Sequence, residues 1–156
     1  MTEQYKPLVI VAGQVRELES TESLNATVTA KEIIRLTAES SYTATVGEAV
    51  YIDGNGTVQA AKADAAASTY PIGFVRGAAD GGSIAAGEVL DIQTDGRAEG
   101  LSGLTAGQKL YLSASSAGDV TATAPSTANQ YVVPVGRAIS ATDILVEIGE
   151  PIKLSA

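Results

Sequence analysis

The sequence contains no histidine and no cysteine, and these two absences exclude most kinds of enzyme site. Without cysteine, the chain can form no disulfide, no thiolate nucleophile and no cysteine-held zinc or iron–sulfur site. Without histidine, it lacks the commonest metal ligand, the usual base of a serine triad and the side chain that titrates near neutral pH. We therefore expect no enzyme activity, no catalytic residues, no bound metal and no cofactor.

Tryptophan is absent as well, and only six tyrosines and one phenylalanine supply aromatic rings. Surfaces that bind bases or sugars use such rings for stacking, so the shortage argues against both. Eighteen acidic residues against ten basic ones give a net charge of −8, which repels phosphate backbones and anionic membranes. The apolar run from Leu8 to Ala12 is too short for a signal peptide or a membrane span. We expect protein partners, with no nucleic acid and no membrane.

Short apolar runs recur along the chain, each bounded by glycine, proline or small polar residues. This pattern is typical of an all-β domain with many short strands, and helical periodicity is nearly missing. The expected strands are residues 8–12, 33–37, 49–53, 57–60, 72–76, 89–94, 109–113, 120–124, 133–138 and 144–148.

Turn chemistry separates several of these strands. Asp53-Gly54-Asn55-Gly56 and Thr94-Asp95-Gly96 offer residues that accept a positive φ, as tight hairpin turns require. They predict two hairpins, and residues 116–119 are similar in composition.

Two stretches of the chain resemble each other. Residues 46–52 match residues 106–112, and each stretch leads into a turn, a strand and a loop rich in small residues. Each loop ends at an apolar-glycine step, at residues 71–73 and 134–136. We predict two similar β units, at about residues 46–95 and 104–150, which form a β-sandwich or barrel over residues 39–156 by covering each other's apolar faces.

Glycines recur at matching places in the two units, and bulky apolar residues fill the strands between them. The glycines mark either a bend or bulge where the chain crosses between sheets, or a plain turn; they are Gly47, Gly107, Gly73 and Gly136. The bulky residues are assigned to the core rather than to a ligand pocket; they are Ile33, Ile34, Leu36, Val50, Ile52, Leu110, Leu112, Ile144, Val146 and Ile148.

Residues 1–38 have no counterpart in either unit, and they mix charged with β-branched residues. Glu17, Glu19 and Glu22 crowd around Ser20 and Thr21 in this part of the chain. An extension that cannot bury both of its faces on its own domain packs on something else, such as the sheet edge of a neighbouring subunit. We interpret residues 1–38 as an N-terminal arm.

Two acidic patterns resemble functional sites but have simpler explanations. Asp53, Asn55, Thr57 and Asp64 are spaced like the ligands of a calcium-binding EF-hand loop. However, Val58 replaces the required sixth-position glycine and no helices flank the loop, so a hairpin turn is favoured. The carboxylate pairs Asp91 with Asp95 and Glu147 with Glu150 fit a turn and a solvent-facing strand better than an acid–base pair.

Several of these segments resemble the structural proteins of tailed bacteriophages. Residues 103–113 and 123–136 look like a module of head decoration and fibre proteins. The first unit, with residues 47–53 and 71–75, is similar to the small capsid-cement (decoration) proteins, and residues 7–18 resemble the start of such virion modules. The resemblance implies a β-rich homotrimer on the outside of the major capsid shell, often with an arm that reaches across its neighbours.

This resemblance leads us to expect a structural virion protein, made in the host cytoplasm, that binds the capsid exterior and stabilises contacts between major capsid protein subunits. Its partners would be the major capsid protein and itself. An alternative is a tail or fibre component that attaches to the host surface. The residues expected to contact the capsid or a neighbouring subunit are Tyr5, Pro7, Leu8, Val9, Ile10, Val11, Val15, Arg16 and Leu18.

Overall fold

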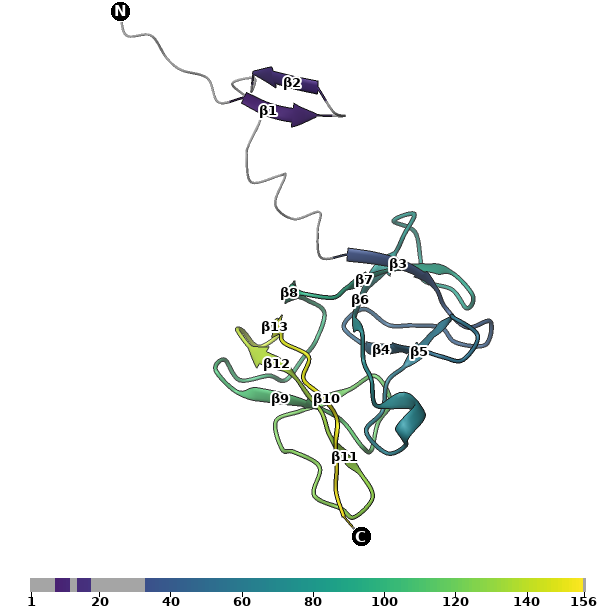
Figure 1. Cartoon of the computed structure of the whole chain (residues 1–156), viewed down its shortest axis with the longest axis vertical. Coiled ribbons are helices and arrows are strands. Elements are labelled where there is room, and N and C mark those ends of the chain that lie inside the picture. The colour runs from purple at the N-terminus through teal and green to yellow at the C-terminus, as the bar shows by residue number, and fades with distance from the viewer. Residues whose placement is uncertain (1–7, 12–13, 18–32, 156) are drawn as a thin grey trace, which may run out of the picture. The chain divides into compact units, whose positions relative to one another are not determined.

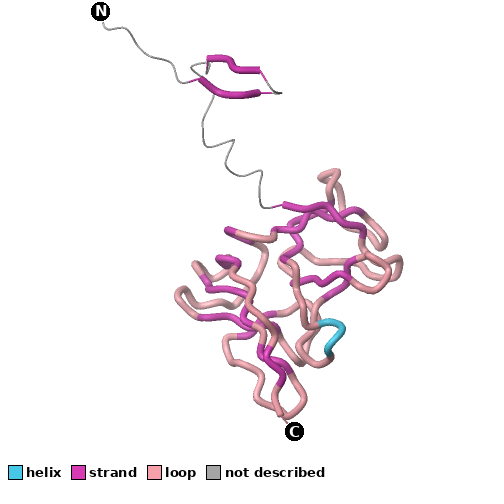
Figure 2. Tube along the Cα trace, viewed as in Figure 1, coloured by secondary structure: helices cyan, strands magenta, loops and turns pink. Residues whose placement is uncertain are grey.

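The computed structural model describes residues 8–11, 14–17 and 33–155 of the chain. The chain divides into two compact units, residues 1–31 and residues 32–156. Figure 2 shows strands and loops throughout the described part, with a single helical turn, η3 (Ala66–Ser68). The predicted all-β fold is therefore confirmed.

The N-terminal unit contains one antiparallel pair of strands, β1 (Leu8–Val11) and β2 (Gln14–Glu17). The sequence predicts β1 but not β2, because Gln14, Arg16 and Glu17 leave β2 a single apolar residue.

The second unit begins with a five-stranded antiparallel sheet, here called the first sheet (Figure 1). Its strand order is β3-β7-β6-β4-β5. The strands are β3 (Ile33–Thr37), β4 (Ala49–Ile52), β5 (Val58–Ala60), β6 (Gly73–Ala78) and β7 (Val89–Gln93).

The first sheet curls until its two edges meet. Ala38, directly after β3 at one edge, forms a parallel bridge with Val58 of β5 at the other edge. The amide of Glu39 also donates to the Val58 carbonyl oxygen, at 3.0 Å. This closure gives the first sheet the character of a small barrel.

A second five-stranded sheet, here called the second sheet, has the order β10-β9-β12-β13-β8. A short separate pair joins β11 (Tyr131–Val132) to β14 (Ile152–Lys153). The strands of the second sheet are β8 (Gly96–Ala98), β9 (Lys109–Leu112), β10 (Val120–Thr121), β12 (Pro134–Ala138) and β13 (Ile144–Val146).

The two sheets have the same strand order, so each strand of one has an equivalent in the other. β3, β7, β6, β4 and β5 correspond to β8, β13, β12, β9 and β10. The pairing registers agree as well: Val50 lies opposite Gly73 in the first sheet, and Leu110 lies opposite Gly136 in the second. The repeated unit is therefore larger than the sequence comparison indicates, because each copy also includes an edge strand.

That edge strand changes the interpretation of residues 33–38. They fall in the range assigned to the arm, yet β3 pairs with β7 along its whole length and the second compact unit begins at residue 32. Their counterpart is β8, which the sequence does not reveal because Gly96-Arg97-Ala98 is short and nearly without bulky apolar residues.

One of the two predicted hairpins is wrong. Residues 53–56 do connect the antiparallel strands β4 and β5. Thr94, Asp95 and Gly96, however, lead from β7 of the first sheet into β8, which pairs with β13 of the second sheet. The same turn-forming residues therefore serve here as the crossover between the sheets.

The core has two parts, one on each face of the first sheet. Val50 and Val75 lie in a cluster inside the curled first sheet, whereas their neighbours Ala49 and Phe74 lie in a cluster shared with the second sheet. The second sheet contributes Leu110, Leu112, Val135, Ile144 and Val146 to this shared cluster. The first sheet is thus buried on both faces, and the second sheet on one.

Most of the predicted core residues are buried or partly buried, with two exceptions. Ile34 is 39% exposed on the edge strand β3, and Ile52 is 44% exposed at the end of β4. Both lie at margins of the first sheet, where strand alternation does not guarantee a covering layer.

The repeated glycines have two different roles. Gly47 and Gly107 lie in equivalent tight turns before β4 and β9, with φ near +88° in each case (89° and 87°). Gly73 and Gly136 lie against a neighbouring strand, where a Cβ would come within 2.3 Å of the Gln93 oxygen and 2.1 Å of the Leu145 oxygen respectively. None of the four lies at the crossover between the sheets, but the register of β12 against β9 shifts between Pro134 and Gly136, as at a β-bulge.

Candidate interaction site

The residues expected to contact a partner lie in the N-terminal unit, and the structure describes six of them. Leu8, Val9, Ile10 and Val11 form β1, and Val15 and Arg16 belong to β2. Tyr5, Pro7 and Leu18 lie outside the described residues.

Strand pairing brings these six residues together. The register places Val9 opposite Arg16 and Ile10 opposite Val15, so the apolar run of β1 lies alongside β2. An isolated two-stranded hairpin is at best marginally stable in water, because too little apolar surface is buried. The hairpin would therefore gain stability by packing against another protein surface.

The Asp53 loop is a hydrogen-bonded turn. The Asp53 carboxylate accepts the amides of Asn55 and Thr57, each at 2.9 Å, and also the Thr57 hydroxyl and the Gln59 side-chain amide at 2.8 and 3.1 Å. Burial acts to raise the pKa of Asp53, but the hydrogen bonds, led by those from Thr57, outweigh it and hold the pKa below the usual 3.8. The carboxylate is thus used in closing the β4–β5 turn, as the hairpin interpretation expects.

One member of each carboxylate pair considered from sequence has a simple structural setting. Asp91 accepts a hydrogen bond from Arg35 Nε at 2.8 Å, and Glu147 is exposed on the solvent side next to β13. Within residues 33–155 and the described strands of the N-terminal unit, no three acidic side chains converge as a metal site would require. In the same part of the chain, no helix is long and apolar enough to cross a membrane.

A depression lies where three turns of the second unit meet. Its one glutamate, Glu48, accepts the Tyr42 hydroxyl at 2.7 Å and the Thr45 amide at 2.8 Å. Burial, followed by the hydrogen bond and the charge of Glu48, raises the pKa of Tyr42. Both side chains therefore hold the turn before β4. The depression is lined by residues 45–48, 100–102 and 118–120.

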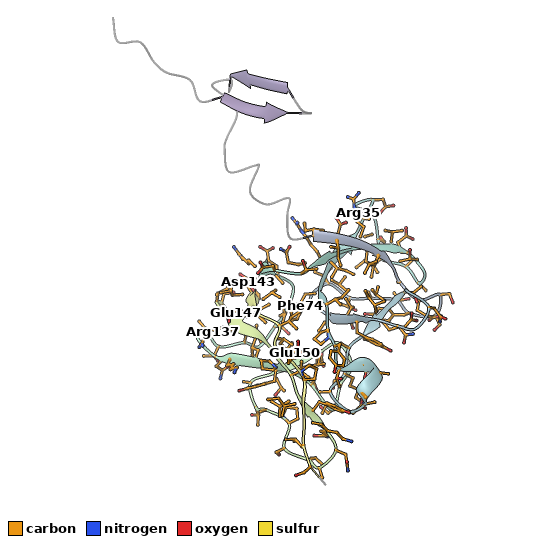
Figure 3. All side chains as sticks on the ribbon, in the orientation of Figure 1. Arg35, Phe74, Arg137, Asp143, Glu147 and Glu150 are labelled. Carbon is orange, nitrogen blue, oxygen red and sulfur yellow. The ribbon has the colours of Figure 1, made fainter. Side chains whose placement is uncertain are left out.

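A row of exposed side chains crosses the uncovered face of the second sheet. Arg97 of β8 lies opposite Leu145 of β13, Leu145 lies opposite Arg137 of β12, and Arg137 lies opposite Lys109 of β9. All four residues are exposed. Figure 3 shows Arg137 at the margin of the molecule and Phe74, its equivalent in the first sheet, in the interior. We call these four residues the cationic row.

The three cations of this row differ in their partners. Arg97 lies 2.7 Å from Asp143 and 3.3 Å from Glu99, so carboxylates neutralise its charge. Arg137 donates to the carbonyl oxygen of Gly107 at 2.8 Å, and the Lys109 ammonium lies 5.5 Å from the centre of the Tyr111 ring.

Sequence reasoning missed the cationic row because its members are far apart in the chain. Only the pairing register places residues 97, 109, 137 and 145 side by side. The one available signal lay in the repeat, where the apolar-glycine steps align Phe74 with Arg137 and Ala49 with Lys109. A change from apolar to cationic residues at equivalent strand positions indicates that the second copy has an uncovered face.

Comparison with known proteins adds no family to this description. No known family model matches the chain, and no curated protein is similar enough to count as a match.

Proposed function

We propose that this chain is a structural virion protein that binds the outer surface of a tailed-phage capsid and stabilises contacts between major capsid protein subunits, as a homotrimer. The sequence resemblance to decoration and cement modules is the reason for naming this class. The all-β fold is compatible with it.

The single observation that carries the proposal is the division of the chain into two compact units. The first unit holds a short hairpin whose first strand, Leu8–Val11, is entirely apolar. Such a hairpin gains stability by packing on another protein surface, since alone it buries little apolar area. An attachment element joined to a domain with its own core is suited to linking neighbouring subunits of a shell.

This role requires buried contact area between proteins and no catalytic residues. A capsid filled with DNA is under outward pressure, and a protein that spans the joints between subunits adds contact area that resists their separation. Three copies of one attachment element on a trimer strengthen binding further, because the second and third contacts form at high effective concentration.

Light scattering on the purified protein, followed by co-sedimentation with capsids that lack it, tests the proposal. We expect a trimer that pellets with the capsids, and we expect deletion of residues 1–18 to weaken this binding. Lys153→Glu, a charge change on the exposed strand β14, is the matched control and should bind as the wild type does. Undiminished capsid binding by the deletion variant would contradict the assigned role of the hairpin.

Two other outcomes would redirect the proposal. A trimer that ignores capsids but binds host cells would support the alternative, a tail or fibre component. Cleavage of host polysaccharide on incubation with the protein would contradict the expectation that the chain has no catalytic activity.

A further inference from the structure

The uncovered face of the second sheet carries three basic side chains on an acidic chain, and alternation places the exposed carboxylates of Glu99 and Glu147 on the same side. The chain has eight more acidic than basic residues, yet the cationic row places Arg97, Arg137 and Lys109 on adjacent registers of one sheet face. Within the described part of the chain, no carboxylate lies within 4.0 Å of the charged groups of Arg137 or Lys109. Two of the three positive charges are therefore available to a partner.

Apolar side chains accompany these charges. Leu145, inside the row, is 38% exposed, and Ile139, two residues beyond Arg137, is 46% exposed. Exposed aliphatic residues beside cations that lack a carboxylate partner are more typical of a protein-docking surface than of a face that only needs to stay soluble.

The internal duplication allows the outer face of the second sheet to be compared with the equivalent face of the first sheet. The equivalents of Arg97, Leu145, Arg137 and Lys109 in the first sheet are Ile33, Gln93, Phe74 and Ala49. Phe74 and Ala49 are fully buried in the cluster shared with the second sheet. In the first copy this side is thus a packing surface for a neighbouring β layer.

A terminal repeat usually needs a polar outer face to stop further stacking. In a chain with eighteen acidic and only ten basic residues, acidic residues could serve that purpose, so arginine and lysine beside exposed leucine and isoleucine need another explanation. The net charge of −8 disfavours a nucleic acid, which would be repelled as a whole. Charge complementarity favours an acidic protein segment.

We propose that the outer face of the second sheet docks an acidic segment of a partner protein, with carboxylates meeting Arg137 and Lys109 and apolar side chains meeting Leu145 and Ile139. This inference goes beyond the proposed function, because it does not depend on which assembly the chain joins. It concerns a different part of the chain from the N-terminal hairpin.

The test is a titration of the isotope-labelled full-length protein with a short synthetic peptide in which glutamates alternate with leucine and serine. We expect amide chemical-shift changes confined to β8, β9, β12 and β13 and the adjoining Ile139. Binding should weaken as salt rises, because screening acts on exposed charges. A peptide with glutamine in place of glutamate should bind far less.

Substitutions then separate a site from general charge attraction. Arg137→Glu together with Lys109→Glu should weaken binding by about tenfold or more, since two attractive contacts become repulsive. Arg76→Glu together with Lys153→Glu makes the same charge change at exposed positions elsewhere and should leave binding unchanged. Leu145→Ser should weaken binding without altering its salt dependence.

Several results would overturn the inference. These are shift changes spread over the whole surface, equal losses in the two double variants, or tighter binding of a single-stranded oligonucleotide than of the acidic peptide. Competition between the peptide and self-association of the protein would instead identify a second copy as the occupant. Each readout is independent of capsid binding, so failure here leaves the proposed function standing, and the reverse also holds.

Discussion

Arg97 Nη2 lies 2.7 Å from Asp143 Oδ2, and a similar ion pair in the first sheet joins Arg35 Nε to Asp91 Oδ1 at 2.8 Å. In both sheets the arginine comes from the edge strand, and the aspartate directly precedes a buried isoleucine of the strand beside it. The two aspartates occupy equivalent positions, but the arginines do not, because the register aligns Arg97 with Ile33 and Arg35 with Glu99. Each ion pair nevertheless joins an edge strand to its neighbour in the sheet.

Acid should weaken the second sheet through Asp143. The Thr142 hydroxyl is the largest influence on this carboxyl; burial opposes it, while Ser140 and Arg97 act with it, so the pKa of Asp143 lies below the usual 3.8. A pKa lowered by folding stabilises the protein above the unfolded value and loses that effect as pH falls through the folded value. We expect Asp143→Asn to lower the free energy of unfolding at neutral pH, with the difference from wild type closing below about pH 4.

Urea denaturation across the acid range measures this difference. Glu147→Gln makes the same carboxylate-to-amide change at an exposed position near β13 and should follow the wild type. A constant gap between Asp143→Asn and wild type down to the lowest pH would show that charge on Asp143 is not the cause.

Gly136→Ala should destabilise the protein strongly. A Cβ at this position would lie 2.1 Å from the Leu145 carbonyl oxygen, and its φ of 148° is one that side chains other than glycine rarely adopt. The β12 and β13 strands would have to separate, which we expect to lower the free energy of unfolding by about 2 kcal/mol or more. Gly54→Ala, with nothing within 4 Å of its Cβ, should change it by less than about 0.5 kcal/mol. Equal thermal midpoints for the two variants would refute this explanation.

Tyr42→Phe should lower stability at neutral pH and make stability depend less on pH in the alkaline range. Burial comes first and Glu48 second among the causes that raise the pKa of Tyr42 above its usual 10.0. A tyrosine that must stay protonated in the fold contributes stability below the unfolded pKa, and this is lost as pH rises above it. The variant should lose about 1 kcal/mol at neutral pH, where the hydrogen bond to Glu48 is intact in wild type.

Denaturation above pH 10 distinguishes this effect from a simple packing change. The wild type should lose stability more steeply with pH than Tyr42→Phe, so the two curves converge. Tyr70→Phe, at a tyrosine that is 60% exposed, is the matched control. Parallel curves would mean that Tyr42 does not carry the alkaline dependence.

Phe74→Ala should weaken the contact between the two sheets. Phe74 is fully buried in the cluster that both sheets share, so its removal leaves a cavity between them. A loss of about 3–5 kcal/mol is typical of such a change. Val75→Ala, which alters the cluster inside the first sheet, serves for comparison. Hydrogen exchange should accelerate most in the second sheet for Phe74→Ala, and a uniform acceleration would argue against a separable interface.

The sequence predicts the strands that carry clear alternation, and it fails where the signal is absent or shared by two structures. Leu110 lies between Lys109 and Tyr111, so its burial follows from alternation, whereas Ile144-Leu145-Val146 is a continuous apolar run in which the structure shows Leu145 facing outward. Gly96-Arg97-Ala98 carries no comparable pattern, although it forms an edge strand. Thr94 to Gly96 has the composition of a hairpin turn, and only the later pairing of β8 with β13 makes it a crossover.

Of the two candidate surfaces, the hairpin is visible in the sequence and the cationic row is not. The apolar run of Leu8 to Val11 is visible in the sequence, and it forms the predicted strand. The cationic row depends on long-range register, which no local pattern encodes. Arg97 and Leu145 become neighbours only because β8 leaves the sheet of the strand that precedes it.

Burial of the first sheet on both faces, against one face for the second, means that the two copies have not had equal freedom to diverge. A change at Ala49 or Phe74 must suit a neighbouring layer, whereas Lys109 and Arg137 are exposed and contact only residues of their own sheet and its turns. New binding properties can therefore evolve on the second copy without disturbing the core.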